Sequence, residues 1–159
     1  MEKQSRWLDE TELRAWMAMR DCTTMLEDHL NRQLRREADL AHADYSLLAH
    51  LSSHPDHLLS MSDLAERLKI TRSRLTHAIT RLEQQGLVER RNHPEDGRLH
   101  LAALTAHGLG VLQDAAPGHV RAVRSAVFDK LSRQQVTELE RICRAIADGL
   151  DEDLPWERR

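Results

Sequence analysis

Hydrogen-bond donors are concentrated between residues 72 and 81 of this 159-residue chain. Leu75, Ile79 and Leu82 recur at spacings of four and three residues, which places them on one buried side of a helix. The opposite side then carries guanidinium, hydroxyl and imidazole groups, namely Arg72, Ser73, Arg74, Thr76, His77, Thr80 and Arg81. Such groups donate hydrogen bonds to base edges and phosphates. The pattern therefore predicts a nucleic-acid contact, and the alternative is an ordinary solvated charged face.

The distribution of charge favours the first interpretation. The whole chain has a net charge of −3 and an isoelectric point of about 6.4, which taken alone argues against a nucleic-acid partner. Residues 67–98, however, hold eight basic and four acidic side chains, for a net charge of +4. The remaining residues hold 15 basic and 22 acidic side chains, for a net charge of −7. A localised basic strip of this kind is typical of a phosphate-binding surface.

Two short helices before the donor-rich segment predict a helix-turn-helix. Asp44 is expected to cap a helix over residues 44–53. Ser60 starts the next helix, and its spacing to Asp63 is that of a capping box. Only a few residues then separate this helix from the one that Thr71 caps, which suits a helix-turn-helix, whose second helix enters the major groove of DNA.

The donor-rich helix is followed by a predicted hairpin. Gly86 ends the helix as a left-handed residue would. Two extended runs, 87–91 and 98–103, then flank a turn rich in Pro, Asp and Gly, and they are the only strands that we expect. Residues 44–103 therefore form a winged helix-turn-helix. In this motif the N-terminal half of the second helix meets the bases, so we expect base contacts from Arg72, Ser73, Arg74, Thr76 and His77, and a phosphate contact from Arg81.

Long helices flank this region on both sides. Residues 9–38 contain neither Gly nor Pro and carry apolar residues at helical spacing, so they predict one long helix whose outer parts pack on another chain. Thr105 caps a helix to about residue 129 that Pro117 and Gly118 weaken. A capping box of Ser132 and Gln135 starts the last helix, whose apolar stripe is Val136, Leu139, Ile142, Ile146 and Leu150. The expected fold is thus mostly α-helical, with a helical dimerisation region formed by 1–38 and 105–159.

Three motifs resemble the multiple-antibiotic-resistance regulator (MarR) family over roughly residues 10–150. They are TRSRLTHAITRLEQQGLVERR at 71–91, PEDGR at 94–98 and LTAHG at 104–108. Members of that family are cytoplasmic transcription regulators that work as homodimers and bind pseudo-palindromic duplex DNA. Many are repressors that small molecules release from DNA. The resemblance therefore implies a homodimer with double-stranded DNA as partner and a small-molecule effector.

The resemblance also assigns residues of the wing. Asp96 and Arg98 match the Asp-x-Arg of the family, so Arg98 is expected to enter the minor groove while Asp96 holds it, although a surface salt bridge between the two is the alternative. A narrow minor groove attracts arginine. We further expect DNA contacts from Arg90, Arg91 and, through phosphate, Ser62. The family often has Asp at the position of His93 and Arg at that of Gly97. The missing cation would weaken minor-groove binding or relax its A/T preference, and the alternative is that Gly97 lets the wing tip turn more tightly.

Composition excludes several other classes of protein. Only five residues are aromatic, which argues against single-stranded nucleic acid, because such binding stacks bases on aromatic rings. A mean hydropathy of −0.60 and the absence of a signal-peptide pattern favour a cytoplasmic protein with no membrane partner. The sequence contains no Gly-rich phosphate loop, nucleophile elbow or zinc-protease motif, so we expect neither an enzyme nor a cofactor.

Other polar residues give weaker signals. Trp16, His29, Tyr45 and His50 could line an effector site, although Trp16 at its spacing is more typical of a core residue. The histidines at 42, 50, 54 and 57 suggest a metal site, but surface histidines at a polar helix end are the preferred interpretation, and no metal is expected. Cys22 and Cys143 are expected to be buried small apolar residues rather than redox sensors.

The sequence thus predicts a homodimeric, sequence-specific regulator of transcription that binds duplex DNA, and a ligand-responsive repressor in particular. The alternative is a helical dimer that senses ligands or binds proteins and has lost DNA binding. The first predicts an affinity for duplex DNA that falls steeply with salt, and the second does not.

Overall fold

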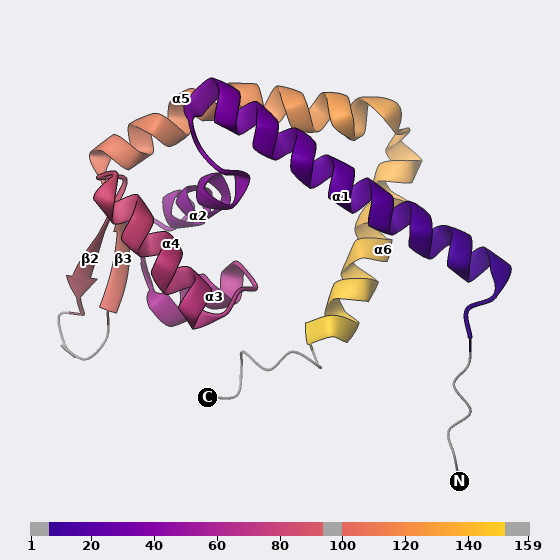
Figure 1. Cartoon of the computed structure of the whole chain (residues 1–159), viewed down its shortest axis with the longest axis horizontal. Helices are drawn as coiled ribbons and strands as arrows, with labels where there is room; N and C mark the ends of the chain where they lie inside the picture. Colours follow the sequence, from indigo (N-terminus) through magenta and orange to yellow (C-terminus); the bar gives the residue numbers. More distant parts are fainter. Residues whose placement is uncertain (1–6, 94–99, 152–159) are drawn as a thin grey trace, which may run out of the picture.

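The computed structural model of the chain describes residues 7–93 and 100–151. Most of these residues are helical, as predicted, and Figure 1 shows two long helices, α1 and α5, above a lobe of shorter elements. In chain order the elements are α1 (Glu10–Ala38), α2 (His42–Ser52), β1 (Leu58–Ser60), α3 (Met61–Arg67), α4 (Arg72–Gln84), β2 (Val88–Asn92), β3 (His100–Leu104), α5 (Ala106–Ala126), the 3₁₀ helix η1 (Phe128–Lys130) and α6 (Arg133–Asp151).

Side-chain caps fix where most of the helices begin, as the sequence predicts. Ser60 Oγ accepts from the backbone N–H of Asp63 at 3.0 Å, and Thr71 Oγ1 accepts from that of Arg74 at 3.3 Å. The capping box of α6 is reciprocal, with Gln135 N–H donating to Ser132 Oγ at 3.2 Å and Ser132 N–H donating to Gln135 Oε1 at 2.9 Å. Each cap satisfies backbone donors that the first turn of a helix leaves unpaired.

The predicted cap of α2 is wrong. This helix begins at His42 after Ala41, which gives no side-chain hydrogen bond, so Asp44 lies inside the first turn. Asp44 is buried there, and its carboxylate accepts a hydrogen bond from Arg81 of α4. A buried carboxylate needs a charged partner, and this long-range pair takes the place of a local cap.

The sheet has one strand more than the sequence predicts. The predicted hairpin is present as β2 and β3, which pair antiparallel with Arg90 opposite Ala102. β1 adds to the other side of β3, with Leu59 opposite Ala102, so the strand order is β1-β3-β2. β1 spans three residues. A run so short carries no period-two pattern that could announce it.

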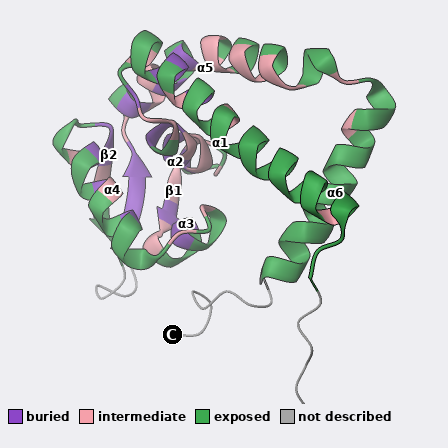
Figure 2. Ribbon diagram, turned by 45° about the vertical axis from the view of Figure 1, so that its right-hand side comes forward, coloured by how far each residue is buried: buried purple, intermediate pink, exposed green. Residues whose placement is uncertain are grey.

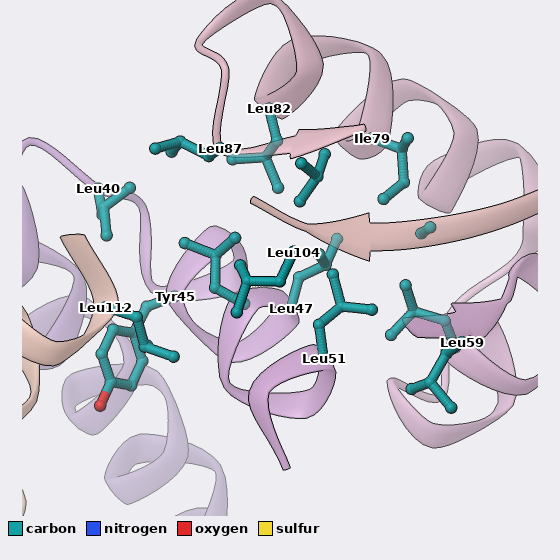
Figure 3. Packing of buried hydrophobic residues seen from close by; sticks show 14 of the residues in the cluster. Leu40, Tyr45, Leu47, Leu51, Leu59, Ile79, Leu82, Leu87, Leu104 and Leu112 are labelled. Carbon is teal, nitrogen blue, oxygen red and sulfur yellow. The ribbon is translucent and has the colours of Figure 1, made fainter. Parts of the chain in front are cut away.

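The core joins α2, α4 and the sheet. Leu75, Ile79 and Leu82 of α4 are fully buried, as predicted, and meet leucines of α2 such as Leu47 and Leu51 (Figure 3). Each such side chain contributes roughly 1.5–3 kcal/mol by leaving water. This packing fixes the rotation of α4 about its axis, and therefore which of its residues face solvent.

The two terminal helices leave apolar surface uncovered in the single chain. Trp16 on α1 is 50% exposed and Ile142 on α6 is 47% exposed, so the interpretation of Trp16 as a core residue is wrong for the isolated chain. Both cysteines, 22 and 143, are exposed as well, contrary to expectation. Figure 2 shows α6 exposed along nearly its whole length. Within the described part of the chain, no helix is both long and apolar enough to cross a membrane.

The wing and the long helix α5 meet where α5 begins. The hydroxyl of Thr105 donates to the carbonyl of Gly86 at 2.7 Å and accepts from the N–H of Gly108 at 2.9 Å. A Cβ placed on Gly108 would lie 2.0 Å from the carbonyl oxygen of Leu87. The Leu-Thr-x-x-Gly motif thus lets α5 begin directly against the segment that leaves α4.

Substitution of two glycines in α5 tests this close approach. Gly108→Ala should lower the free energy of unfolding by about 1–3 kcal/mol, because the methyl group must displace the Leu87 carbonyl. Gly110→Ala is the matched control, since a Cβ there meets nothing within 4 Å. It should be neutral or raise stability by up to about 1 kcal/mol, as Ala favours helix over Gly. Urea denaturation measures both, and equal effects would contradict the contact.

Candidate nucleic-acid interface

The exposed side of α4 carries all the residues of this helix that were predicted to bind nucleic acid. Because the leucine and isoleucine stripe faces the core, the opposite side is open to solvent. Its exposed residues, which we call the recognition face, are Arg72, Ser73, Arg74, Thr76, His77, Thr80 and Arg81. The structure thus brings them together on one surface, in the order that the helical period predicts.

Two arginines of the recognition face keep their charge unpaired. Within residues 7–93 and 100–151, no carboxylate forms an ion pair with Arg72 or Arg74. Both lie in the first turn of α4, whose unpaired N–H groups also favour anions. The hydroxyls of Thr76 and Thr80 donate back to the carbonyls of Arg72 and Thr76, each at 2.9 Å, and so leave their oxygen lone pairs as acceptors.

Arg81 and Arg90 differ from these two because local carboxylates hold them. Arg81 pairs with the buried Asp44, although half of its own side chain remains exposed. The guanidinium of Arg90 on β2 donates to Glu83 at 2.7 Å and to the hydroxyl of Thr80 at 2.7 Å. These contacts fasten α4 to α2 on one side and to the wing on the other.

The remaining residues of the wing are only partly described. Arg91 is exposed and donates to Glu89 at 2.7 Å. Asp96, Gly97 and Arg98 lie outside the described residues, so the predicted minor-groove contact has no geometry here.

A cleft of about 550 Å³ connects the recognition face to α3 and the sheet. Ser62, the predicted phosphate contact, lines it together with Arg72, Thr76 and Arg90. Ser60 and His100 also line this cleft, although neither was predicted to bind nucleic acid. His100 follows Arg98 at the strand period of two, so alternation along this strand could have identified it.

The four residues predicted to line an effector site lie in different places. His29 lines a cleft between α1 and α5, whereas Tyr45 lines a separate cavity between α2 and α5. Trp16 is exposed on α1, and His50 is half-buried on α2. Nothing in the described residues gathers three His, Cys, Asp or Glu side chains at one point, as a metal site would need.

Tyr45 belongs instead to a small aromatic stack. Its ring centroid lies 4.3 Å from that of His119, which lies 5.4 Å from that of His42. Burial raises the pKa of the Tyr45 phenol. Burial, and then the neighbouring His42, lower the pKa of His119, so this imidazole favours its neutral form. His42 contacts Glu27 at 2.8 Å.

Comparisons with known proteins point to one family. The model of the MarR family matches residues 38–99, which include the helix-turn-helix and most of the wing. Sco3205 of Streptomyces coelicolor, a MarR family regulator solved in complex with DNA, is 49% identical with a TM-score of 0.92, over 96% of this chain and 100% of that one. AbsC of the same organism, also a MarR family regulator, is 37% identical with a TM-score of 0.89, over 93% and 99% of the two chains.

A relative from another organism is also a transcription regulator. The HTH-type transcriptional repressor YetL of Bacillus subtilis is 28% identical over 128 residues, which are 80% of this chain and 75% of that protein. The family consists of transcription regulators rather than enzymes. The high identity to Sco3205 and AbsC extends over nearly their full lengths, and so this chain belongs to the MarR family of winged helix-turn-helix, DNA-binding transcription regulators.

Proposed function

We propose that the chain is a ligand-responsive repressor that binds a pseudo-palindromic operator as a homodimer. The observation that carries this proposal is the recognition face, where Arg72 and Arg74 are exposed and free of carboxylates among the described residues. A relative at 49% identity was solved with DNA, and another relative is a repressor, which supports both parts of the assignment.

Each polar residue then has a proposed role on duplex DNA. Arg72, Ser73, Arg74, Thr76 and His77 contact base edges, because they form the N-terminal half of the recognition face. Thr80 lies farther along the same face. Ser62, Arg81, Arg90 and Arg91 contact the sugar-phosphate backbone. Arg98 enters the minor groove and Asp96 orients it.

The uncovered apolar surface supports a homodimer. Leu139, Ile142, Ile146 and Leu150 form an apolar stripe on α6, and each is at least 37% exposed in the single chain. Contacts of α6 with the rest of the described chain are sparse. Soluble monomers rarely leave such a surface open, so a second copy is its natural cover. A two-fold axis then places two α4 helices in major grooves about one helical turn apart, ~34–36 Å.

Removal of one arginine tests the DNA contact. Arg74→Ala should weaken binding to a duplex that the protein itself selects from a random pool by ~1–3 kcal/mol, and should relax specificity at one base pair, if Arg74 pairs with a guanine. Fluorescence anisotropy at several salt concentrations measures the affinity. The wild-type affinity should fall steeply with salt, because several phosphates are neutralised per dimer.

A charge-matched control separates contact from general electrostatics. Arg35 is exposed on α1, so Arg35→Ala removes the same charge far from α4. It should leave both affinity and specificity nearly unchanged. Equal losses in the two variants, or a wild type that binds no duplex at low salt, would contradict the proposal and favour a sensing or protein-binding module.

Charge placed on α6 tests the dimer. Ile142→Glu combined with Ile146→Glu should yield monomers at micromolar concentration, because carboxylates would be buried without partners in the interface. Light scattering should then give the chain mass of 18.3 kDa instead of twice that value. Arg141→Gln combined with Arg144→Gln changes the net charge equally and should remain dimeric. A dimer in both double variants would show that this stripe is not the interface.

A further inference from the structure

A cleft with a polar lining lies between α1 and α5, away from the recognition face. The two helices lie side by side near the C-terminal end of α1 (Figure 1). The cleft has a volume of about 570 Å³, and none of its lining residues comes from α2 or from the DNA-binding face. Its polar lining includes His29, Arg32, Gln33, Arg36, Arg121 and Ser125.

The charge around this cleft is positive. Three guanidinium groups line it, against the single carboxylate of Glu37. Glu37 contacts Arg36 at 2.8 Å, and these hydrogen bonds with Arg36 and Gln33 lower the pKa of Glu37, so it is ionised. Arg121 has no carboxylate within ion-pair distance in the described part of the chain. Arg32 also pairs with a carboxylate, that of Asp28 at 2.8 Å, so Arg121 gives the cleft one positive charge that the described residues leave unpaired.

A buried amide lies at the floor of the cleft. Gln33 is 95% buried (5% exposed), and its Nε2 donates to Glu37 Oε2 at 2.7 Å, which fixes which end of the amide faces Glu37. The other end, Oε1, is buried without a donor among the described residues. A buried acceptor without a donor is costly. The last torsion of glutamine is broad, so a small rotation can turn this oxygen toward a donor placed in the cleft.

Gly118 of α5 makes this arrangement possible. A Cβ at this position would lie 2.4 Å from Glu37 Oε2 and 3.1 Å from Gln33 Nε2. Any other residue would therefore push the Gln33–Glu37 pair out of its place. Gly118, which together with Pro117 was predicted only to weaken the helix, thus leaves space for the polar pair at the floor of the cleft.

We propose that this cleft binds a small carboxylate that also carries a hydroxyl group. The carboxylate meets the guanidinium group of Arg121, since guanidinium groups bind carboxylates in bidentate geometry. The hydroxyl donates to Gln33 Oε1. The volume is in the range of sites for small molecules. This ligand site rests on the ligand-responsive part of the proposed function, since such a ligand would connect α1 to α5.

A pair of ligands that differ by one hydroxyl tests the proposal. Malate and succinate share two carboxylates, and only malate offers the donor. Calorimetry on the full chain without DNA should show malate binding about 5- to 10-fold more tightly than succinate, because the hydroxyl pairs an otherwise unpaired acceptor. Glycerol, which is neutral, should not bind.

Three single substitutions test which residues contact the ligand. Gln33→Leu should abolish the preference for malate over succinate, because it removes the unpaired acceptor Oε1. Arg121→Ala should weaken both ligands at least ~10-fold, through loss of a charge-assisted contact. Arg124→Ala is the matched control, because Arg124 lies on the same helix, pairs with Asp129 at 3.0 Å and does not line the cleft. Circular dichroism and urea denaturation confirm that each variant folds.

Three outcomes would overturn the proposal. They are no heat with either dicarboxylate at millimolar concentration, equal losses in Arg121→Ala and Arg124→Ala, and a malate preference that survives Gln33→Leu. The first would also result if a second copy of the chain covered the cleft. Because DNA binding is measured on the same preparation in a separate assay, failure of this inference is distinguishable from failure of the proposed function.

Discussion

The burial of Leu75, Ile79 and Leu82 in the core that α4 shares with α2 and the sheet is the constraint on which the rest of the structure depends. These three side chains fix the rotation of α4, and rotation alone decides which residues of this helix meet solvent. A helix turned by one residue, about 100°, would bring leucines to the surface and take arginines into the core. The recognition face is therefore exposed because apolar side chains on the opposite side of the same helix pack into the core.

Ion pairs then divide the basic residues into two groups. Arg81 and Arg90 are held by Asp44 and Glu83, and they join α4 to α2 and to the wing. Arg72 and Arg74 have no such partner among the described residues and keep their charge available. A count of charges along residues 67–98 treats all of these alike. Their division is visible only in three dimensions, because Asp44 is 37 positions from Arg81 and Glu83 meets Arg90 across the turn between α4 and β2.

Features of local origin could be predicted from the sequence, and features of distant origin could not. The caps at Ser60, Thr71, Thr105 and Ser132 depend on neighbours within three residues, and each was predicted. The burial of Asp44 depends on a residue 37 positions away, so local reasoning assigned it a cap instead. β1 is too short to show a period and exists because β3 offers it an edge. Of the candidate site, the helical period predicted the recognition face, whereas the α1–α5 cleft needs the fold.

In the proposed homodimer, the terminal helices hold two recognition faces at a fixed spacing that matches successive major grooves. Footprinting of the wild-type protein on the DNA beside its own gene tests this claim most directly. The account predicts two protected segments about one helical turn, ~10 base pairs, apart at low salt, with protection lost as salt rises. Absence of protection at low salt, or protection without any sequence preference, would contradict it.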